Sequence, residues 1–230
     1  MSERIEKILA RELNEPRSRV KTLLQKGQVT VDGVVARAGQ QADPDTQEIC
    51  LAGEPIACRA FVYLMLNKPT GVLSATDGKG EPTVLDLVPS ALRRKALFPA
   101  GRLDKDTTGL MILTDDGALA HEILAPQKHV PKQYRVTIDI AMTEEMVHRF
   151  AEGIELKDGR CQPAELTIES EDTGVVTLRE GRYHQIKRMF GVYGAGVNAL
   201  HRRSIGGVAL DAALAPGQWR ELTEEEVEKL

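Results

Sequence analysis

The sequence predicts an α+β protein made of a small helix–helix–hairpin unit and a larger domain with a mixed, mostly antiparallel sheet. Strand-like segments outnumber helix-like segments and mostly follow one another directly along the chain, which is typical of antiparallel sheets and not of alternating strand–helix folds. The signals of regular structure weaken over residues 53–59, GEPIACR. We place the linker there and expect the two domains to occupy residues 1–58 and 59–230.

The small unit is predicted from four segments. Apolar residues at helical spacing indicate a helix over residues 3–13, and a second helix follows over 18–27, where a glycine gives the C-terminal stop. Residues 28–36 alternate around Asp32-Gly33, which is a strong signal of a β-hairpin. Residues 43–51, DPDTQEICL, supply a further strand after a turn.

The elements of the larger domain are predicted from the spacing of its apolar residues and from its turn residues. The predicted strands cover residues 61–76 (two strands about a Lys-Pro turn), 109–117, 132–140, 163–170, 174–181 and 197–210. The predicted helices cover residues 118–124, 143–153 and 184–194. A capping box from Thr223 to Glu226 begins a further helix at the C-terminus.

The composition excludes several classes of protein. Hydrophobic residues make up 42% of the 230 residues and charged residues 28%, as in ordinary globular proteins. A run of about 18 apolar residues is absent, which excludes a membrane span, and the charged N-terminus is not a signal peptide. Three cysteines without CxxC spacing favour a reducing cytoplasm and argue against a zinc site. Nucleotide-binding glycine motifs are absent too, so we expect no metal and no cofactor.

Charge is unevenly distributed along the chain. The net charge is −4 and the pI is near 5.8, which argues mildly against a nucleic-acid partner. Residues 16–30, however, carry four cations and no acid, and residues 179–203 carry six cations against Glu180 alone. Such segregation is compatible with a polyanion bound on one face. Solvated helix faces would give the same pattern.

Three short motifs carry the candidate chemistry. The first, GRLDKDTTGL at 101–110, sets Asp104 among cations at what looks like the start of a strand. It also fits the D-x-D-x-T pattern of a phosphatase superfamily, but Pro99 and Gly101 interrupt the apolar strand that such a fold needs. The second and third motifs are KQYRV at 132–136 and EGRYHQIKRM at 180–189. Taken singly, these two read as a half-buried strand tyrosine and a basic surface helix.

Together, the three motifs occur in the order and at the separations found in the small-subunit ribosomal RNA pseudouridine synthase A family, which this sequence resembles over nearly its whole length. Residues 63–84, YLMLNKPTGVLSATDGKGEPTV, resemble the opening strand and turn of that family. Residues 200–226, LHRRSIGGVALDAALAPGQWRELTEEE, resemble its C-terminal stretch. The first unit resembles the alpha-L RNA-binding domain shared with a small-subunit ribosomal protein. The resemblance implies a cofactor-free RNA isomerase that converts a uridine of 16S rRNA to pseudouridine.

The resemblance also implies roles for individual residues. The family's catalytic aspartate falls on Asp104, its active-site tyrosine on Tyr134 and the basic partner of its aspartate on Lys187. Arg102 matches an arginine that enters the stack where the uridine leaves. The further expected substrate contacts are Arg182, His184 and Gln185. The expected RNA-binding residues are Arg4, Lys7, Arg17, Arg19, Lys21, Lys26, Arg188, Arg202 and Arg203.

Asp106 is interpreted as a turn or supporting carboxylate and is not assigned to catalysis. We expect the partner to be ribosomal RNA within a small-subunit assembly intermediate, and the protein to be a cytoplasmic monomer. Two alternatives stay open. One is a sister synthase acting on large-subunit rRNA, against which the segment LHRRSIGG argues. The other is a non-catalytic RNA-binding assembly factor.

Overall fold

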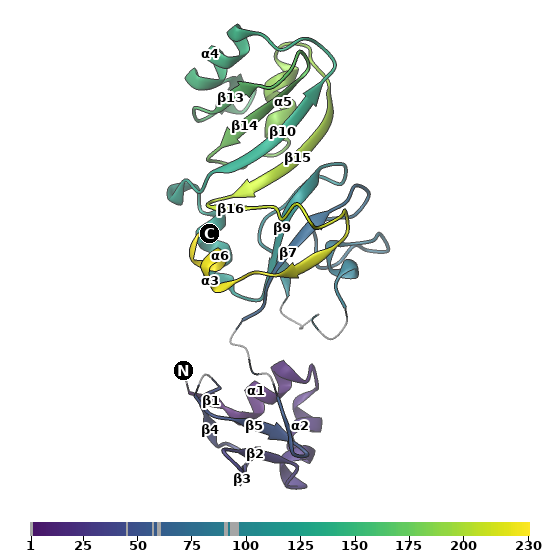
Figure 1. The fold of residues 1–230 in the computed structure, drawn as a ribbon, viewed down its shortest axis with the longest axis vertical. Coiled ribbons are helices and arrows are strands. Elements are labelled where there is room, and N and C mark those ends of the chain that lie inside the picture. Colours follow the sequence, from purple (N-terminus) through teal and green to yellow (C-terminus); the bar gives the residue numbers. More distant parts are fainter. Residues whose placement is uncertain (1, 45, 57, 59–60, 90–91, 93–96) are drawn as a thin grey trace. The chain divides into compact units, whose positions relative to one another are not determined.

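The computed structural model describes residues 2–44, 46–56, 58, 61–89, 92 and 97–230. The chain forms two compact units, one of residues 1–62 and 89–97 and a larger one of residues 63–88 and 98–230. The boundary predicted between residues 58 and 59 falls among residues 57, 59 and 60, which lie outside the described residues. It therefore stays a prediction. Figure 1 labels most of the elements used below.

The small unit packs two helices on a small sheet. Ile5, Ile8 and Leu9 of the first helix are fully buried with Val20 of the second, as their helical spacing requires. Asp32 and Gly33 both have positive φ, 49° and 77°, so the predicted hairpin turn is confirmed. The elements are β1 (Glu3–Arg4), α1 (Ile5–Glu12), α2 (Arg17–Gln25), β2 (Val29–Val31), β3 (Val34–Val35), β4 (Gln41–Ala42), β5 (Ile49–Leu51) and β6 (Glu54–Pro55).

The small sheet runs in the order β3-β2-β5-β6, and β1 pairs separately with β4. Strand β6 corrects the sequence prediction, because Glu54–Pro55 lies where we placed the linker and pairs with β5. Residues this close to a strand can fold back on it through a tight turn, and Ala52 and Gly53 take the required positive φ angles.

The larger unit is built on a nine-stranded sheet in which β13-β14-β10-β15-β9-β7-β17 follow one another, with β16 beside β15 and β8 beside β9. Within the described part of this sheet, only β15 and β9 pair in parallel, and the other strand pairs are antiparallel. The predicted α+β class with a mostly antiparallel sheet is thus confirmed. The strands are β7 (Tyr63–Lys68), β8 (Phe98–Pro99), β9 (Thr108–Thr114), β10 (Lys132–Ile138), β13 (Glu165–Ile168), β14 (Thr173–Leu178), β15 (Val197–Ile205), β16 (Val208–Ala209) and β17 (Trp219–Glu221).

Helices cover one side of the outer strands. Phe150 of α4 and Phe190 of α5 pack with ring centroids 4.9 Å apart, and both belong to the core that Val136 of β10 and Val176 of β14 share. The helices are α3 (Gly117–Leu124), α4 (Glu144–Glu152), α5 (Gln185–Gly191) and α6 (Glu224–Glu228), with 3-10 turns at η1 (Val84–Leu87) and η3 (Pro126–Lys128) and a small hairpin of β11 (Glu155–Leu156) and β12 (Gly159–Arg160). Among the described residues, no helix is long and apolar enough to cross a membrane.

One predicted strand is wrong. After the Lys-Pro turn, the segment of residues 71–76 makes only an isolated bridge, between Leu73 and Thr83. The side chain of Ser74 binds the neighbouring loop instead, since its hydroxyl donates to the carbonyl of Leu103 and accepts from the N–H of Leu103. The pattern of this segment resembles a strand, but its hydrogen bonds go to a turn.

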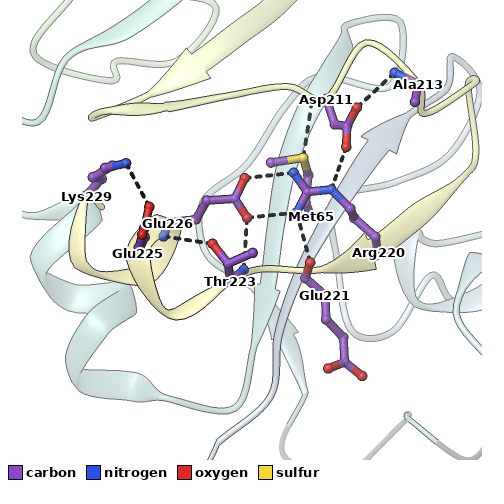
Figure 2. Close-up of polar contacts among 9 residues, drawn as sticks. All are labelled: Met65, Asp211, Ala213, Arg220, Glu221, Thr223, Glu225, Glu226 and Lys229. Carbon is purple, nitrogen blue, oxygen red and sulfur yellow. Dashed lines mark hydrogen bonds and ion pairs between the residues drawn. The ribbon is translucent and has the colours of Figure 1, made fainter.

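The C-terminal segment closes the edge of β7. Strand β17 pairs with β7 and places Trp219 opposite Leu66, and α6 begins with the predicted capping box, which is confirmed. Figure 2 shows Arg220 fastening this segment: its Nε lies 2.7 Å from Asp211, and its two terminal nitrogens each lie 2.7 Å from an oxygen of Glu226. This pairing lowers the pKa of Glu226 to about 2.

Candidate active site

The loop that carries Asp104 is held by a buried lysine at the end of β7. Lys68 is 0% exposed, and its Nζ donates to the carbonyls of Pro69 at 3.0 Å, Lys105 at 3.3 Å and Thr107 at 2.9 Å. Burial lowers the pKa of Lys68 to about 8, although the nearby Asp106 and Asp104 oppose this. The ammonium group therefore fixes the backbone on both sides of residue 106.

The sequence reasoning missed Lys68. The available signal was a lysine at the end of an apolar run, directly before a proline. A lysine in that position has no water within reach unless the chain turns outward, so it needs acceptors from the protein. The structure supplies them from the loop of residues 104–107.

A glycine allows β9 to approach β15 beside this loop. Gly109 has φ of +102°, and a Cβ placed on it would lie 2.3 Å from the carbonyl oxygen of Arg202. Arg202 itself is 2% exposed, and its Nε donates to the carbonyl of Leu110 at 2.7 Å. The side chain of Arg202 thus braces two strands, and its assignment to RNA binding stays a prediction. Its alternation with the buried Leu200 could have indicated an inward position.

Asp104 has two cationic or potentially cationic partners from the start of α5. Its Oδ1 lies 3.3 Å from Nε2 of His184, and its Oδ2 lies 3.1 Å from Nζ of Lys187. Lys187 also reaches both oxygens of Asp106, at 2.7 and 2.9 Å. Asp106, which was not assigned to catalysis, thus shares the lysine with Asp104.

The charges in this cluster stabilise one another. Burial disfavours the charged form of Lys187, but hydrogen bonds to Asp106 and Asp104 outweigh it and raise the pKa of Lys187. The Lys187 ammonium in turn lowers the pKa of Asp106. Lys187 therefore stays protonated at neutral pH and provides a fixed positive charge beside Asp104.

Two cavities meet at Asp104, His184 and Lys187. One, of about 100 Å³, is lined on its other sides by Arg102 and Tyr134. The other, of about 520 Å³, is lined by Thr70, Gly71, Lys105 and Asp106. All seven residues predicted for catalysis and for substrate contact line the smaller cavity, and they are Arg102, Asp104, Tyr134, Arg182, His184, Gln185 and Lys187.

Two of these seven residues have their side chains engaged within the protein. Gln185 is 4% exposed, accepts from the N–H of Arg182 and donates to Glu180 at 2.6 Å. The guanidinium of Arg182 is directed to the turn of β11 and β12, where it contacts Asp158 and the carbonyl of Gly159. Both residues thus fix the entrance to α5 rather than presenting free donors to the cavity.

The remaining predicted RNA-binding cations are divided between the two units. In the small unit, Arg4, Lys7, Arg17 and Lys21 line one surface cavity of about 710 Å³, while Arg19 and Lys26 are exposed without lining it. In the larger unit, Arg188 pairs with Asp158 and Arg203 pairs with Glu169.

This arrangement suits chemistry at an ionised carboxylate. Asp104 lines a cavity together with the aromatic ring of Tyr134, and its two oxygens lie near His184 and Lys187. Such a carboxylate can attack an electrophilic carbon or accept a proton. Within the described part of the chain, no group of three or more His, Cys, Asp or Glu side chains could hold a metal ion.

Comparison with known proteins matches both units. The family described as RNA pseudouridylate synthase matches residues 62–191, and the S4 domain matches residues 3–47. The ribosomal small subunit pseudouridine synthase A of Escherichia coli (strain K12) is 40% identical over 227 residues, with 97% of this chain and 98% of that protein covered. An uncharacterised RNA pseudouridine synthase of Bacillus subtilis (strain 168) is 45% identical over 233 residues, covering 99% and 98% of the two chains.

A solved structure also resembles the whole chain. A crystal structure described as pseudouridylate synthase superposes with a TM-score of 0.71 at 37% identity and covers 98% of both chains. The likeness therefore extends over both units and includes the loop that carries Asp104.

Proposed function

Because this chain belongs to the RNA pseudouridylate synthase family, we propose that it converts a uridine of small-subunit ribosomal RNA to pseudouridine, with Asp104 as the catalytic group. The family makes it an isomerase, and its S4 domain makes it an RNA-binding protein. The observation that carries the catalytic assignment is the position of Asp104, which is held between His184 and Lys187 at the wall of a cavity.

The reaction needs a charged oxygen and a confined space. The N1–C1′ bond of the uridine breaks, the base turns, C5 bonds to C1′ and loses its proton, and N1 takes up a proton, without any net oxidation or reduction. Asp104 acts in this scheme as a nucleophile or as a base on the sugar. Lys187 provides a positive charge beside the carboxylate, because hydrogen bonds to Asp106 and Asp104 raise the pKa of Lys187. The cavity keeps the freed uracil close to the sugar while it turns.

Tyr134 and Arg102 are proposed to handle the extruded base. A base leaves its stack at a cost of a few kcal/mol. Tyr134 offers a flat ring on the cavity wall, and Arg102, which is exposed, lies at the same cavity. A planar guanidinium can stack and hydrogen-bond in the space that the uridine vacates.

The choice of small-subunit rRNA rests on the names of the relatives. We propose that the substrate is ribosomal RNA within a small-subunit assembly intermediate, and that a monomeric enzyme meets it in the cytoplasm, where ribosomes are assembled. The six cations of the S4 unit would contact phosphates, which position RNA without reading its sequence.

The test is tritium release from rRNA labelled at C5 of uridine, measured with Asp104→Asn and with Asp106→Asn as its matched control. Asparagine keeps the shape of the side chain but removes its charge, so Asp104→Asn should abolish release while RNA binding changes little. Asp106→Asn should lose much less, because Lys187 would still pair with Asp104. Turnover of Asp104→Asn within about tenfold of wild type would contradict the assignment. Release from large-subunit rRNA alone would contradict the choice of substrate.

A further inference from the structure

An exposed aromatic ring stands next to the candidate active site. Tyr183 is 76% exposed, the largest value among the exposed large hydrophobic residues in the described part of the chain. It lies between β14 and α5, directly before His184. A large apolar side chain left in water beside a cavity needs an explanation, since burying it would stabilise the fold.

One face of the Tyr183 ring is already covered. The ring stacks on that of His184 with centroids 3.8 Å apart and an angle of 17° between the planes. The Nε2 of His184 lies 3.3 Å from Oδ1 of Asp104. The exposed tyrosine is thus connected through one imidazole ring to the catalytic carboxylate.

The backbone is strained at this point. His184 has φ of 47° and ψ of 37°, in the left-handed region, which is uncommon and unfavourable for residues other than glycine. The strain is maintained by contacts on both sides, because Gln185 is fixed by Glu180 and the carbonyl of Tyr183 accepts from Arg188 at 3.1 Å. The surrounding contacts thus hold His184 in an unfavourable backbone conformation at the proposed catalytic site. This points to a function for the rings of Tyr183 and His184.

We propose that Tyr183 and His184 form a stacking platform for an RNA base next to the target uridine. The base would lie on the open face of Tyr183, so that base, tyrosine, histidine and Asp104 follow one another. This proposal rests on the proposed function. A flat, sequence-tolerant aromatic surface fits a nucleobase, and the exposed cation Arg102, which lines the cavity together with His184, fits a phosphate that accompanies it.

The platform has a consequence for catalysis. Extruding the target uridine leaves its neighbour without a stacking partner. A neighbour that stacks on Tyr183 regains that contact and also restrains the His184 ring, which in turn orients Asp104. Tyr183 is therefore a positioning residue, and its effect should appear mainly in the RNA concentration that half-saturates the enzyme.

The experiment compares Tyr183→Ala, Tyr183→Phe and the control Val192→Ala in single-turnover tritium release across a range of RNA concentrations. The RNA is a fragment around a uridine first mapped as modified by the wild-type enzyme. Val192 is also exposed and apolar, at 52%, but lines neither cavity. Tyr183→Ala should raise the half-saturating RNA concentration roughly 5- to 100-fold, whereas Tyr183→Phe and Val192→Ala should behave as wild type.

A second measurement places the base. 2-Aminopurine substituted on either side of the target uridine should lose fluorescence on binding to wild type and to Tyr183→Phe, and should lose less with Tyr183→Ala. The platform would be overturned if Tyr183→Ala left the half-saturating RNA concentration unchanged, or if Tyr183→Phe raised it as much as Tyr183→Ala does. In either case, tritium release by the wild-type enzyme would still support the proposed function. Wild-type protein that releases no tritium from any rRNA would instead overturn the proposed function.

Discussion

Replacing Lys68 by methionine tests whether this residue positions the catalytic loop, because we expect the rate to fall much more than the stability of the fold. Methionine fills a similar volume but offers no hydrogen bonds. The carbonyls of Pro69 and Thr107 then lose the Lys68 ammonium, whereas the carbonyl of Lys105 keeps the N–H of Gly71. Each buried acceptor left unsatisfied costs about 1–3 kcal/mol, so the two together cost about 4 kcal/mol.

The lost charge offsets most of this. Burial lowers the pKa of Lys68 from 10.5 to about 8, which corresponds to a penalty of about 3 kcal/mol for keeping the group charged. Removing the lysine removes that penalty. The free energy of unfolding should therefore fall by only about 1 kcal/mol, which shifts the melting temperature by about 2–4 °C. The loop around Asp104, however, loses its anchor, and a displacement of about 1 Å costs about 100-fold in rate.

Lys132→Met is the matched control. Lys132 is also buried, its pKa is also lowered to about 8 by burial, and its Nζ donates to the carbonyls of Ile123 and Val130, away from the catalytic loop. Both variants should show similar melting temperatures, but only Lys68→Met should lose single-turnover rate at saturating RNA. A Lys68→Met enzyme as fast as Lys132→Met would refute the reasoning.

The pH dependence of stability gives a second check on Lys68. Its folded pKa lies below its unfolded pKa, so between pH 8 and 10.5 the unfolded chain binds more protons than the folded one. Stability from this group therefore increases as pH rises through that window. In denaturant unfolding, the free energy of unfolding of wild type relative to that of Lys68→Met should increase by up to about 3 kcal/mol over the same pH range. A constant difference would show that Lys68 titrates alike in both states.

Three further outcomes are expected. Lys187→Met should lower the single-turnover rate at saturating RNA roughly 100-fold or more, whereas Arg188→Met, whose partners are Asp158 and the carbonyl of Tyr183, should lower it much less; equal rates would move the role of Lys187 elsewhere. Gly109→Ala should lower the melting temperature strongly. Gly53→Ala should lower it only mildly, because Gly53 also has a positive φ but a Cβ added there would have no atom within 4 Å. Similar shifts in melting temperature would exclude steric contact with β15 as the cause. Arg220→Met should cost about 1–2 kcal/mol at neutral pH. The difference from wild type should vanish as pH falls from 4.5 towards 2, because both carboxylate partners of Arg220, Glu226 and Asp211, have lowered pKa values. A difference that persists at pH 2 would count against the ion pairs.

The sequence predicts which residues form the candidate site better than it predicts the contacts that hold those residues in place. Asp104, Tyr134 and Lys187 lie in three motifs whose order and spacing are recognisable, and the structure brings all three to one cavity. The sharing of Lys187 with Asp106 is not readable from sequence, because it depends on distances between a loop and a helix 81 residues apart.

Burial of cations is equally hard to predict. Arg202 and Arg203 are neighbours of the same charge, yet one braces two strands inside the sheet and the other pairs with Glu169 on the surface. Strand alternation decides between them, but only once the register is known. The sequence does not predict the short strands β6 and β17 either. Their own residues carry no strand pattern, and they are strands because they pair with β5 and β7.

The pairing of β17 with β7 bears on the order in which the enzyme can be completed during synthesis. Asn67, the residue before Lys68, exchanges backbone hydrogen bonds with Gly217 and Gln218, and its amide donates to the carbonyl of Leu214. While a nascent chain still lacks these last residues, the strand that anchors the catalytic loop has an open edge. Chains truncated before Leu214 should therefore be cleaved rapidly near β7 in limited proteolysis. The segment from Leu214 to Gln218 thus contributes to the support of the catalytic loop, because it pairs with the strand that ends in Lys68.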